Sequence, residues 1–158
     1  MAFAAKTTVE ARDSRAEIER LLEKHGADAF AYGNADGTAT VQFRMQGRII
    51  RFRLAVLSRE DKFFTEYWQG RTLFRRSETE IDKRHGQLVR SRWRALLLVV
   101  KAKLEAIDLG ILTFEDEFLA NTVLSNNQTV SDWVQPQVDS NYRLGKMPDV
   151  MALTGPRR

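Results

Sequence analysis

The chain has 158 residues, of which 43% are hydrophobic, and its 25 lysine and arginine residues against 21 aspartate and glutamate residues give a net charge of +4. This length suits one ordinary domain with its own core, and the composition excludes a disordered chain and an acidic mimic of DNA. The absence of cysteine excludes a disulfide scaffold, a thiol nucleophile and a metal site built on thiolates.

The first predicted element is a helix that begins at Ser14 and ends before Gly26. Ser14 is a suitable N-cap because Glu17, three residues later, completes a capping box, and apolar residues then recur at helical spacing. The preceding residues, 1–13, are expected to form an N-terminal arm.

Three strands are predicted next, over residues 29–33, 38–46 and 48–57. The pairs Asp36-Gly37 and Gln46-Gly47 supply the positive φ that two-residue hairpin turns need, so we expect an antiparallel meander. These turns fix the register, which places apolar residues opposite one another on one face: Phe43 with Ile50, Val41 with Phe52, Phe30 with Phe43, and Tyr32 with Val41. The other face is polar and cationic and carries Thr40, Gln42, Arg44, Ile49, Arg51 and Arg53.

The segment of residues 58–76 has no clean periodicity and is predicted to be a long loop or a short strand pair. A long helix follows it. Ser77 is the predicted N-cap, with Glu80 three positions later, and the helix ends at about Leu109, where Gly110 suits the C-terminus.

The last third is predicted to hold two short helices. Thr113 and Asp116 form a capping pair for a helix over residues 114–123, and Pro136, which suits the first helical position, starts a final helix that ends at Gly145. The predicted fold class is therefore α+β: a helix, a three-stranded antiparallel meander, a long helix and small C-terminal helices. The expected domains are a basic core, an acidic helical region and a tail, over residues 14–110, 111–150 and 151–158.

The charge is spread unevenly along the chain. Residues 44–103 carry a net charge of +10, whereas residues 1–43 carry −2 and residues 104–153 carry −6. This asymmetry favours a polyanion as the partner of the middle segment, with the last third as a solvated cap or a protein contact. The alternative is that the two signs neutralise each other across the fold.

Arginines in the middle segment are candidate nucleic-acid contacts. Adjacent strands lie about 5 Å apart, so the guanidinium groups that they carry repel one another. Phosphates relieve that repulsion and accept bidentate hydrogen bonds. Aromatic side chains between arginines offer surfaces for unpaired bases, which favours single-stranded DNA. The predicted binding residues are Arg44, Arg48, Arg51 and Arg53 on the sheet, Tyr67, Trp68, Arg71, Arg75 and Arg76 in the aromatic segment, and Arg90 and Arg94 on the long helix.

Each of these clusters also has an ordinary interpretation. Phe63, Phe64 and Phe74 would simply fill the core, the acidic last third would cover the sheet arginines, and the helix arginines would form a solvated flank. If the acidic third is instead a surface for a host or phage protein, its contact residues are predicted to be Glu115, Asp116, Glu117, Asp132 and Asp139.

No catalytic motif is found in the sequence. No metal site is expected from the two histidines, His25 and His85, and no phosphate-binding glycine loop or nucleophile elbow occurs. The longest apolar run, residues 95–100, is far shorter than the roughly 20 residues that span a bilayer. We therefore expect a cytoplasmic protein that is not an enzyme, uses no cofactor and does not bind membranes.

Several runs of sequence carry a family resemblance. The stretches VQFRMQGRIIRFRL, RSRWRALLLVVKAKLEAIDLGILTFEDEFLA and TVSDWVQPQV resemble a group of small proteins encoded by bacterial viruses and prophages, a group without an assigned function. The resemblance implies a host cytoplasm. The element order is also similar to that of double-stranded-RNA-binding domains and of phage single-strand annealing proteins, although no motif of either matches.

The expectation from the sequence is a non-catalytic nucleic-acid-binding protein of phage origin that acts in viral DNA replication, recombination or genome handling. The alternative is a phage protein-interaction module that inhibits a host defence or transcription complex. Self-association into a homo-oligomer stays open.

Overall fold

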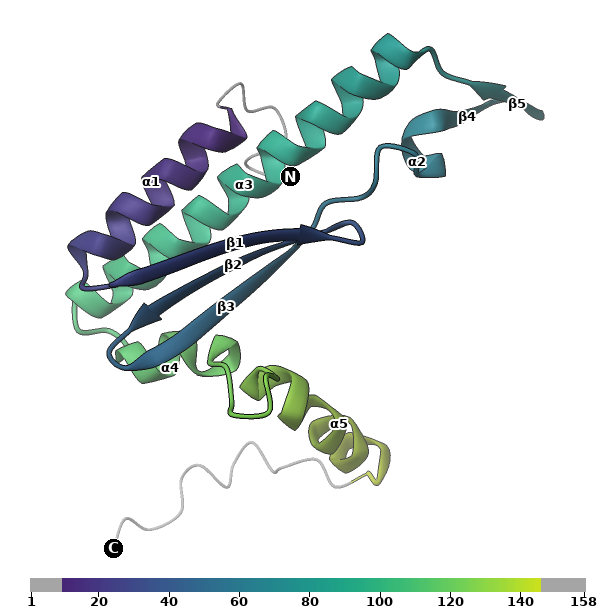
Figure 1. Cartoon of the computed structure of the whole chain (residues 1–158). Helices are drawn as coiled ribbons and strands as arrows, with labels where there is room; N and C mark the ends of the chain where they lie inside the picture. Colours follow the sequence, from purple (N-terminus) through teal and green to yellow (C-terminus); the bar gives the residue numbers. More distant parts are fainter. Residues whose placement is uncertain (1–9, 146–158) are drawn as a thin grey trace, which may run out of the picture.

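A three-stranded antiparallel sheet and a 31-residue helix set the architecture of the chain (Figure 1). The computed structural model describes residues 10–145, and the α+β class and the order of elements are as predicted. The elements are α1 (Ala11–Lys24), β1 (Ala29–Ala35), β2 (Thr38–Met45), β3 (Arg48–Ala55), α2 (Lys62–Thr65), β4 (Glu66–Gln69), β5 (Thr72–Arg75), α3 (Glu78–Asp108), α4 (Phe114–Phe118), the 3₁₀ turn η1 (Leu119–Asn121) and α5 (Val130–Arg143).

The register of the three-stranded sheet is the predicted one. Phe43 lies opposite Ile50 and Phe30, and Val41 lies opposite Phe52 and Tyr32. Both residues of each turn have positive φ, 49° and 71° in the first turn and 50° and 72° in the second, so the two turns are of type I′. The turn pairs therefore place the apolar side chains on one face and the arginines on the other.

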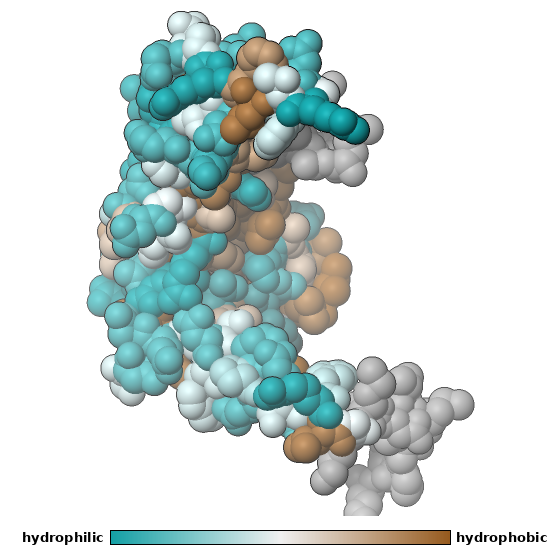
Figure 2. All heavy atoms as spheres, turned by 90° about the vertical axis from the view of Figure 1, so that its right-hand side faces the viewer, coloured by the Kyte–Doolittle hydropathy of each residue, from teal (hydrophilic) through white to brown (hydrophobic). Residues whose placement is uncertain are grey.

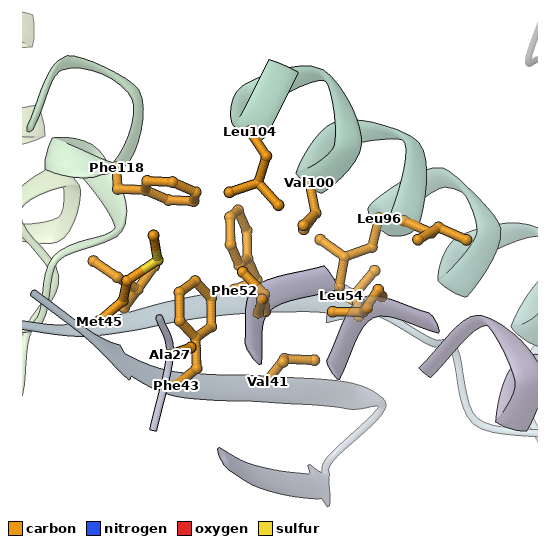
Figure 3. Packing of buried hydrophobic residues seen from close by; sticks show 14 of the residues in the cluster. Ala27, Val41, Phe43, Met45, Phe52, Leu54, Leu96, Val100, Leu104 and Phe118 are labelled. Atoms are coloured by element: carbon orange, nitrogen blue, oxygen red, sulfur yellow. The ribbon is translucent and has the colours of Figure 1, made fainter. Parts of the chain in front are cut away.

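The hydrophobic core lies between the apolar sheet face and two helices, α1 and α3 (Figure 3). Side chains of β2 and β3 point toward Leu97 and Val100 of α3, both fully buried, and toward Ile18 and Leu22 of α1. Phe118 of α4 closes one end of this cluster. Among the described residues, no helix is both long and apolar enough to cross a membrane.

The first helix begins earlier than its capping signal predicted. Glu10 occupies the N-cap position, and Ser14 lies inside the helix, fully buried. The reason is packing, because Ala11 contacts the core and draws the first turn onto it. Residues 11–13 therefore belong to α1 instead of an arm, and residues 1–9 lie outside the described part of the chain.

The C-terminal helices also differ from the prediction. The helix at residue 114 ends at Phe118 and continues as the 3₁₀ turn. The last helix begins at Val130, because Thr129 and Asp132 form a complete capping box, and Pro136 lies inside the helix. The predicted start at Pro136 is wrong, whereas the capping residues Ser77 and Thr113 are confirmed. The predicted tail, residues 151–158, is outside the described residues.

His25 joins the C-terminal ends of α1 and α3. Its Nε2 lies 3.0 Å from Asp108 Oδ2 and its Nδ1 lies 2.7 Å from Leu21 O. Two acceptors require both ring nitrogens to carry hydrogen, so the imidazolium is favoured, and the Asp108 carboxylate raises the pKa of His25 above its ordinary 6.5.

The raised pKa of His25 predicts a pH-dependent stability. The stabilisation of the fold by the contact between His25 and Asp108 is fully present below the ordinary pKa of histidine. It is lost as pH rises through the raised pKa of His25. We expect the melting temperature to fall as pH rises above about 6.5, the ordinary pKa of histidine, and His25→Gln to remove this part of the fall. A His85→Gln variant is the control and should keep it. Identical pH profiles for wild type and His25→Gln would contradict the prediction.

Candidate nucleic-acid interface

The four sheet arginines all have partners within the domain. Arg44 donates two hydrogen bonds to Asp28, at 2.7 and 3.1 Å, and the guanidinium of Arg53 donates to both oxygens of Asp132, at 2.9 and 3.0 Å. Arg48 pairs with Glu115, and Arg51 donates to Gln42 and to two oxygens of Asn127. The mutual repulsion predicted for this face is therefore relieved by the chain itself.

The acidic last third reaches these arginines by running along β3. The backbone N–H of Val123 donates to Ile49 O at 2.8 Å, and the Asn121 amide donates to Arg51 O at 3.1 Å. This path leads to the first turn of α5, where Asp132 caps the helix and faces Arg53. The hydrogen bond from Arg53, with those from Thr129, holds the pKa of Asp132 well below its ordinary value.

The predicted protein-contact carboxylates are mostly engaged inside the domain. Glu115 and Asp132 hold sheet arginines, Asp116 completes the capping box of α4, and Glu117 accepts from Lys103 Nζ at 2.8 Å. Asp139 accepts a hydrogen bond from Gln135 and lies exposed on α5. Glu115, Glu117 and Asp132 therefore connect the last third to the core, and the five residues do not form one free acidic surface.

The pairing of the sheet arginines predicts a stability effect. Replacing Arg48 and Arg53 by glutamine should lower the melting temperature slightly, because both arginines form exposed ion pairs, which contribute little individually. The decrease should shrink in about 1 M salt, where the Debye length is about 3 Å. A matched control, Arg71→Gln with Arg75→Gln, removes two arginines without ion pairs. Equal melting temperatures for the two variants would show that the contacts along β3 do not stabilise the fold.

The helix arginines join α3 to the first helix and do not form a separate surface. Arg90 lies 3.8 Å from Glu10 and donates to Gln87, and Arg94 lies 3.7 Å from Glu17. The structure therefore does not bring Arg90 and Arg94 together with the aromatic segment.

The aromatic segment, residues 58–76, forms the helical turn α2 and a small hairpin of β4 and β5. Of the two predicted alternatives, a long loop or a short strand pair, the strand pair is confirmed. Strands β4 and β5 are joined by a two-residue turn in which Gly70 has a φ of 61°, the Gly-first pattern of a type II′ turn. Tyr67 lies opposite Phe74 and Trp68 opposite Leu73. The hairpin projects from the N-terminal end of α3, away from the three-stranded sheet (Figure 1).

Most of the large apolar side chains of this segment are exposed. Trp68 is 68% exposed and Phe63 is 65% exposed, and Tyr67, Leu73 and Phe74 are exposed as well. Figure 2, which faces this end of the molecule, shows hydrophobic side chains among hydrophilic ones at its top. Of the three phenylalanines that the alternative interpretation placed in the core, Phe64 is buried, whereas Phe63 and Phe74 are exposed. For Phe63 and Phe74 that interpretation is wrong. Contiguous exposed apolar groups of this kind mark binding surfaces.

Arg76 and Phe64 fix the hairpin to the long helix. The Arg76 guanidinium donates to the carbonyls of Phe64, at 3.1 Å, of Phe63, at 3.3 Å, and of Glu66, and it lies over the Tyr67 ring at 5.1 Å. The Phe64 ring is fully buried and packs edge-on against His85 of α3. The Arg76 side chain is only 12% exposed, so it positions the hairpin and, contrary to the prediction, is not available to bind a phosphate.

Three cations beside the exposed rings have no charged partner. Within residues 10–145, Lys62, Arg71 and Arg75 make no ion pair or side-chain hydrogen bond, and all three are exposed. Of the neighbouring acids, Asp61 caps α2 and Glu60 bonds with Ser58, and Glu66, which lies opposite Arg75 in the hairpin, forms no ion pair with it. The register puts Tyr67 and Phe74 on one face of the hairpin and Trp68, Leu73 and Arg75 on the other. We call the following set, which covers both faces, the hairpin surface: Lys62, Phe63, Tyr67, Trp68, Arg71, Leu73, Phe74 and Arg75.

Sequence reasoning missed Lys62, Phe63, Leu73 and Phe74 as part of this surface. The signal was present, because a two-residue turn at Gly70-Arg71 puts Trp68 opposite Leu73 on a ribbon too short to bury either face. No group of three or more metal-ligating side chains occurs in the part of the chain that the structure describes.

No family model, curated protein or solved structure matches this chain. The functional assignment therefore depends on the chemistry of the chain itself, and the hairpin surface is where exposed rings and unpaired cations coincide.

Proposed function

We propose that this protein binds single-stranded nucleic acid, without catalysing a reaction, through the hairpin surface. The observation that carries the proposal is the contrast between two arginine clusters. The sheet arginines Arg44, Arg48 and Arg53 are neutralised by Asp28, Glu115 and Asp132, whereas Arg71 and Arg75 form no ion pair within residues 10–145 and belong to the same hairpin as an exposed tryptophan.

The chemistry of the hairpin surface fits an unpaired strand. A base stacked on an exposed aromatic ring contributes about 1–3 kcal/mol, and stacking tolerates any sequence because every base has a π face. Arginine adds bidentate hydrogen bonds to phosphate. A duplex keeps its bases stacked on one another, so its affinity for Trp68 and Phe63 should be lower. In a phage, such binding would serve DNA replication, recombination or genome handling.

A titration over a range of salt concentrations tests the proposal. Labelled single-stranded DNA, single-stranded RNA and duplex DNA are each titrated with protein, and we expect the single strands to bind more tightly than the duplex. If Lys62, Arg71 and Arg75 each contact one phosphate, the slope of log affinity against log salt should be about −2. No binding at low salt, or tighter binding to the duplex, would exclude the proposed function.

The second candidate is a protein-interaction module. Phe63 and Leu73 favour it, because these exposed side chains have no polar group and suit the apolar centre of a protein interface. Its partner would be a component of a host defence or transcription complex. Salt separates the two candidates, since an apolar protein contact should persist at ionic strengths that abolish binding to phosphate.

A further inference from the structure

A hollow lies beside Arg15, between α1, α3 and the three-stranded sheet. It has a volume of about 690 Å³ and is bounded by the start of α1, the turn between β1 and β2, the segment after β3 and the middle of α3. Small side chains line this space, among them Ala11 and Ala39. Figure 2 shows the surface hollowed below the hairpin end, with hydrophobic side chains at the bottom of the hollow. The volume is within the roughly 300–1,000 Å³ typical of small-ligand pockets.

Arg15 lines the hollow with a guanidinium that has no polar partner. Its carbon Cζ lies 4.6 Å from the centre of the Tyr32 ring and 5.3 Å from that of the Trp93 ring, so the aromatic rings hold the group in place. Its Nε is inaccessible and makes no hydrogen bond, and no carboxylate among residues 10–145 forms an ion pair with it. The nearby Glu19 accepts instead from the Tyr32 hydroxyl, at 3.3 Å. Arg15 is half-buried, and its terminal nitrogens make no hydrogen bond within the described residues, so this cation suits an anionic ligand.

The rest of the lining suits a planar, partly apolar body. Val56, Val89 and Trp93 provide apolar surface, and Asn34, Ser58 and His85 add polar groups at the margin. The second guanidinium of the lining, that of Arg59, is already held by Glu78 and Asp82, with donor distances of 2.8 and 2.6 Å. Arg15 is therefore the one lining cation in the described chain that is free to receive an anion.

We infer that this hollow binds a nucleoside monophosphate, with its phosphate on Arg15 and its base against the apolar lining. The ligand is either a free mononucleotide or the phosphorylated end of a strand, and the second form rests on the proposed function of the hairpin surface. The two sources share their chemistry and differ only in whether the nucleotide continues into a strand.

A protein with one remaining tryptophan provides a direct test. The chain has three tryptophans, so Trp68→Phe with Trp133→Phe leaves Trp93 at the hollow as the only tryptophan reporter. We expect dTMP to change the Trp93 fluorescence saturably, and thymidine, which lacks the phosphate, to bind at least tenfold more weakly, as expected for loss of a charge-assisted hydrogen bond. No saturable response to dTMP, or equal binding of thymidine, would overturn the inference.

Two variants test the assignment to the hollow. Arg15→Gln should weaken dTMP binding at least tenfold, whereas Arg12→Gln, on the same helix with a side chain 92% exposed, should leave it unchanged. Ala39→Leu places a larger side chain in the hollow, because Ala39 lines it on the sheet face that carries Tyr32. This variant changes no charge and should also abolish binding, so the test does not depend on the folding of Arg15→Gln. Unchanged dTMP affinity in Ala39→Leu would place the nucleotide elsewhere and overturn the inference.

Oligonucleotides then separate the two sources and the two proposals. If the ligand is a strand end, a 5′- or 3′-phosphorylated single strand should bind the wild-type protein more tightly than the same strand with free hydroxyls, and Arg15→Gln should remove that difference only. If phosphorylation has no effect while dTMP binds, the ligand is the free mononucleotide. Binding of dTMP without binding of any oligonucleotide would refute the function of the hairpin surface and leave the hollow assigned.

Discussion

Replacing Arg71 and Arg75 by glutamine together with Trp68→Ala should reduce the affinity for single-stranded nucleic acid at least a hundredfold. Loss of the stacked ring removes about 1–3 kcal/mol. Each lost charge-assisted hydrogen bond removes about 1.5–3 kcal/mol more at full strength. The slope of log affinity against log salt should also become shallower by about 1.4, for two phosphate contacts. Fluorescence anisotropy with a labelled strand measures both quantities.

The hairpin variant has a matched control on the sheet. Arg44→Gln with Arg48→Gln removes the same number of charges, but these arginines are already paired with Asp28 and Glu115, so the affinity should change little. The hairpin variant should unfold like the wild type, because none of its three substituted residues belongs to the main hydrophobic cluster. If the sheet variant loses affinity and the hairpin variant keeps it, the binding face is the sheet.

The sequence was sufficient to predict the three-stranded sheet because its signals are local. Asp36-Gly37 and Gln46-Gly47 each specify a two-residue turn, and a two-residue turn leaves no freedom in the register of its strands. The alternation of apolar and polar residues then assigns the faces. The long helix was predictable for the same reason, since Ser77 and Gly110 mark its ends.

The pairing of the sheet arginines was not predictable because its partners are distant in sequence. Arg53 and Asp132 are separated by 79 positions, and Arg48 and Glu115 by 67. The incorrect predicted start of the last helix also made the pair of Arg53 and Asp132 unpredictable. With the last helix starting at Pro136, Asp132 falls in a loop, whereas the capping box of Thr129 places it in the first turn of α5, facing β3.

The charge asymmetry along the chain therefore has two different meanings. In the sheet, the basic middle and the acidic last third meet and form ion pairs. At the end of α3, Lys62, Arg71 and Arg75 form no ion pair within the described residues. A count of charges by segment cannot separate these two cases, because the distinction depends on which residues of the last third come near β3.

The substitution with the largest expected effect on stability is Phe118→Ala. The Phe118 ring is fully buried, with ring centroids 5.9 Å from Phe43, 6.3 Å from Phe52 and 5.1 Å from Phe114. It attaches α4, and with it the segment that runs along β3, to the core of the sheet (Figure 3). Removing a buried phenylalanine costs about 3–5 kcal/mol, from lost transfer free energy and the cavity that remains.

Urea denaturation measures this cost against a neighbour on the same turn. Leu119→Ala removes an exposed side chain, so its free energy of unfolding should change by only about 0.5 kcal/mol or less. A single transition shifted to lower urea would show that the last third unfolds together with the sheet. Two separate transitions in Phe118→Ala would show that this ring couples two units that are otherwise independent. An effect of Phe118→Ala no larger than that of Leu119→Ala would mean that α4 lies on the core without stabilising it.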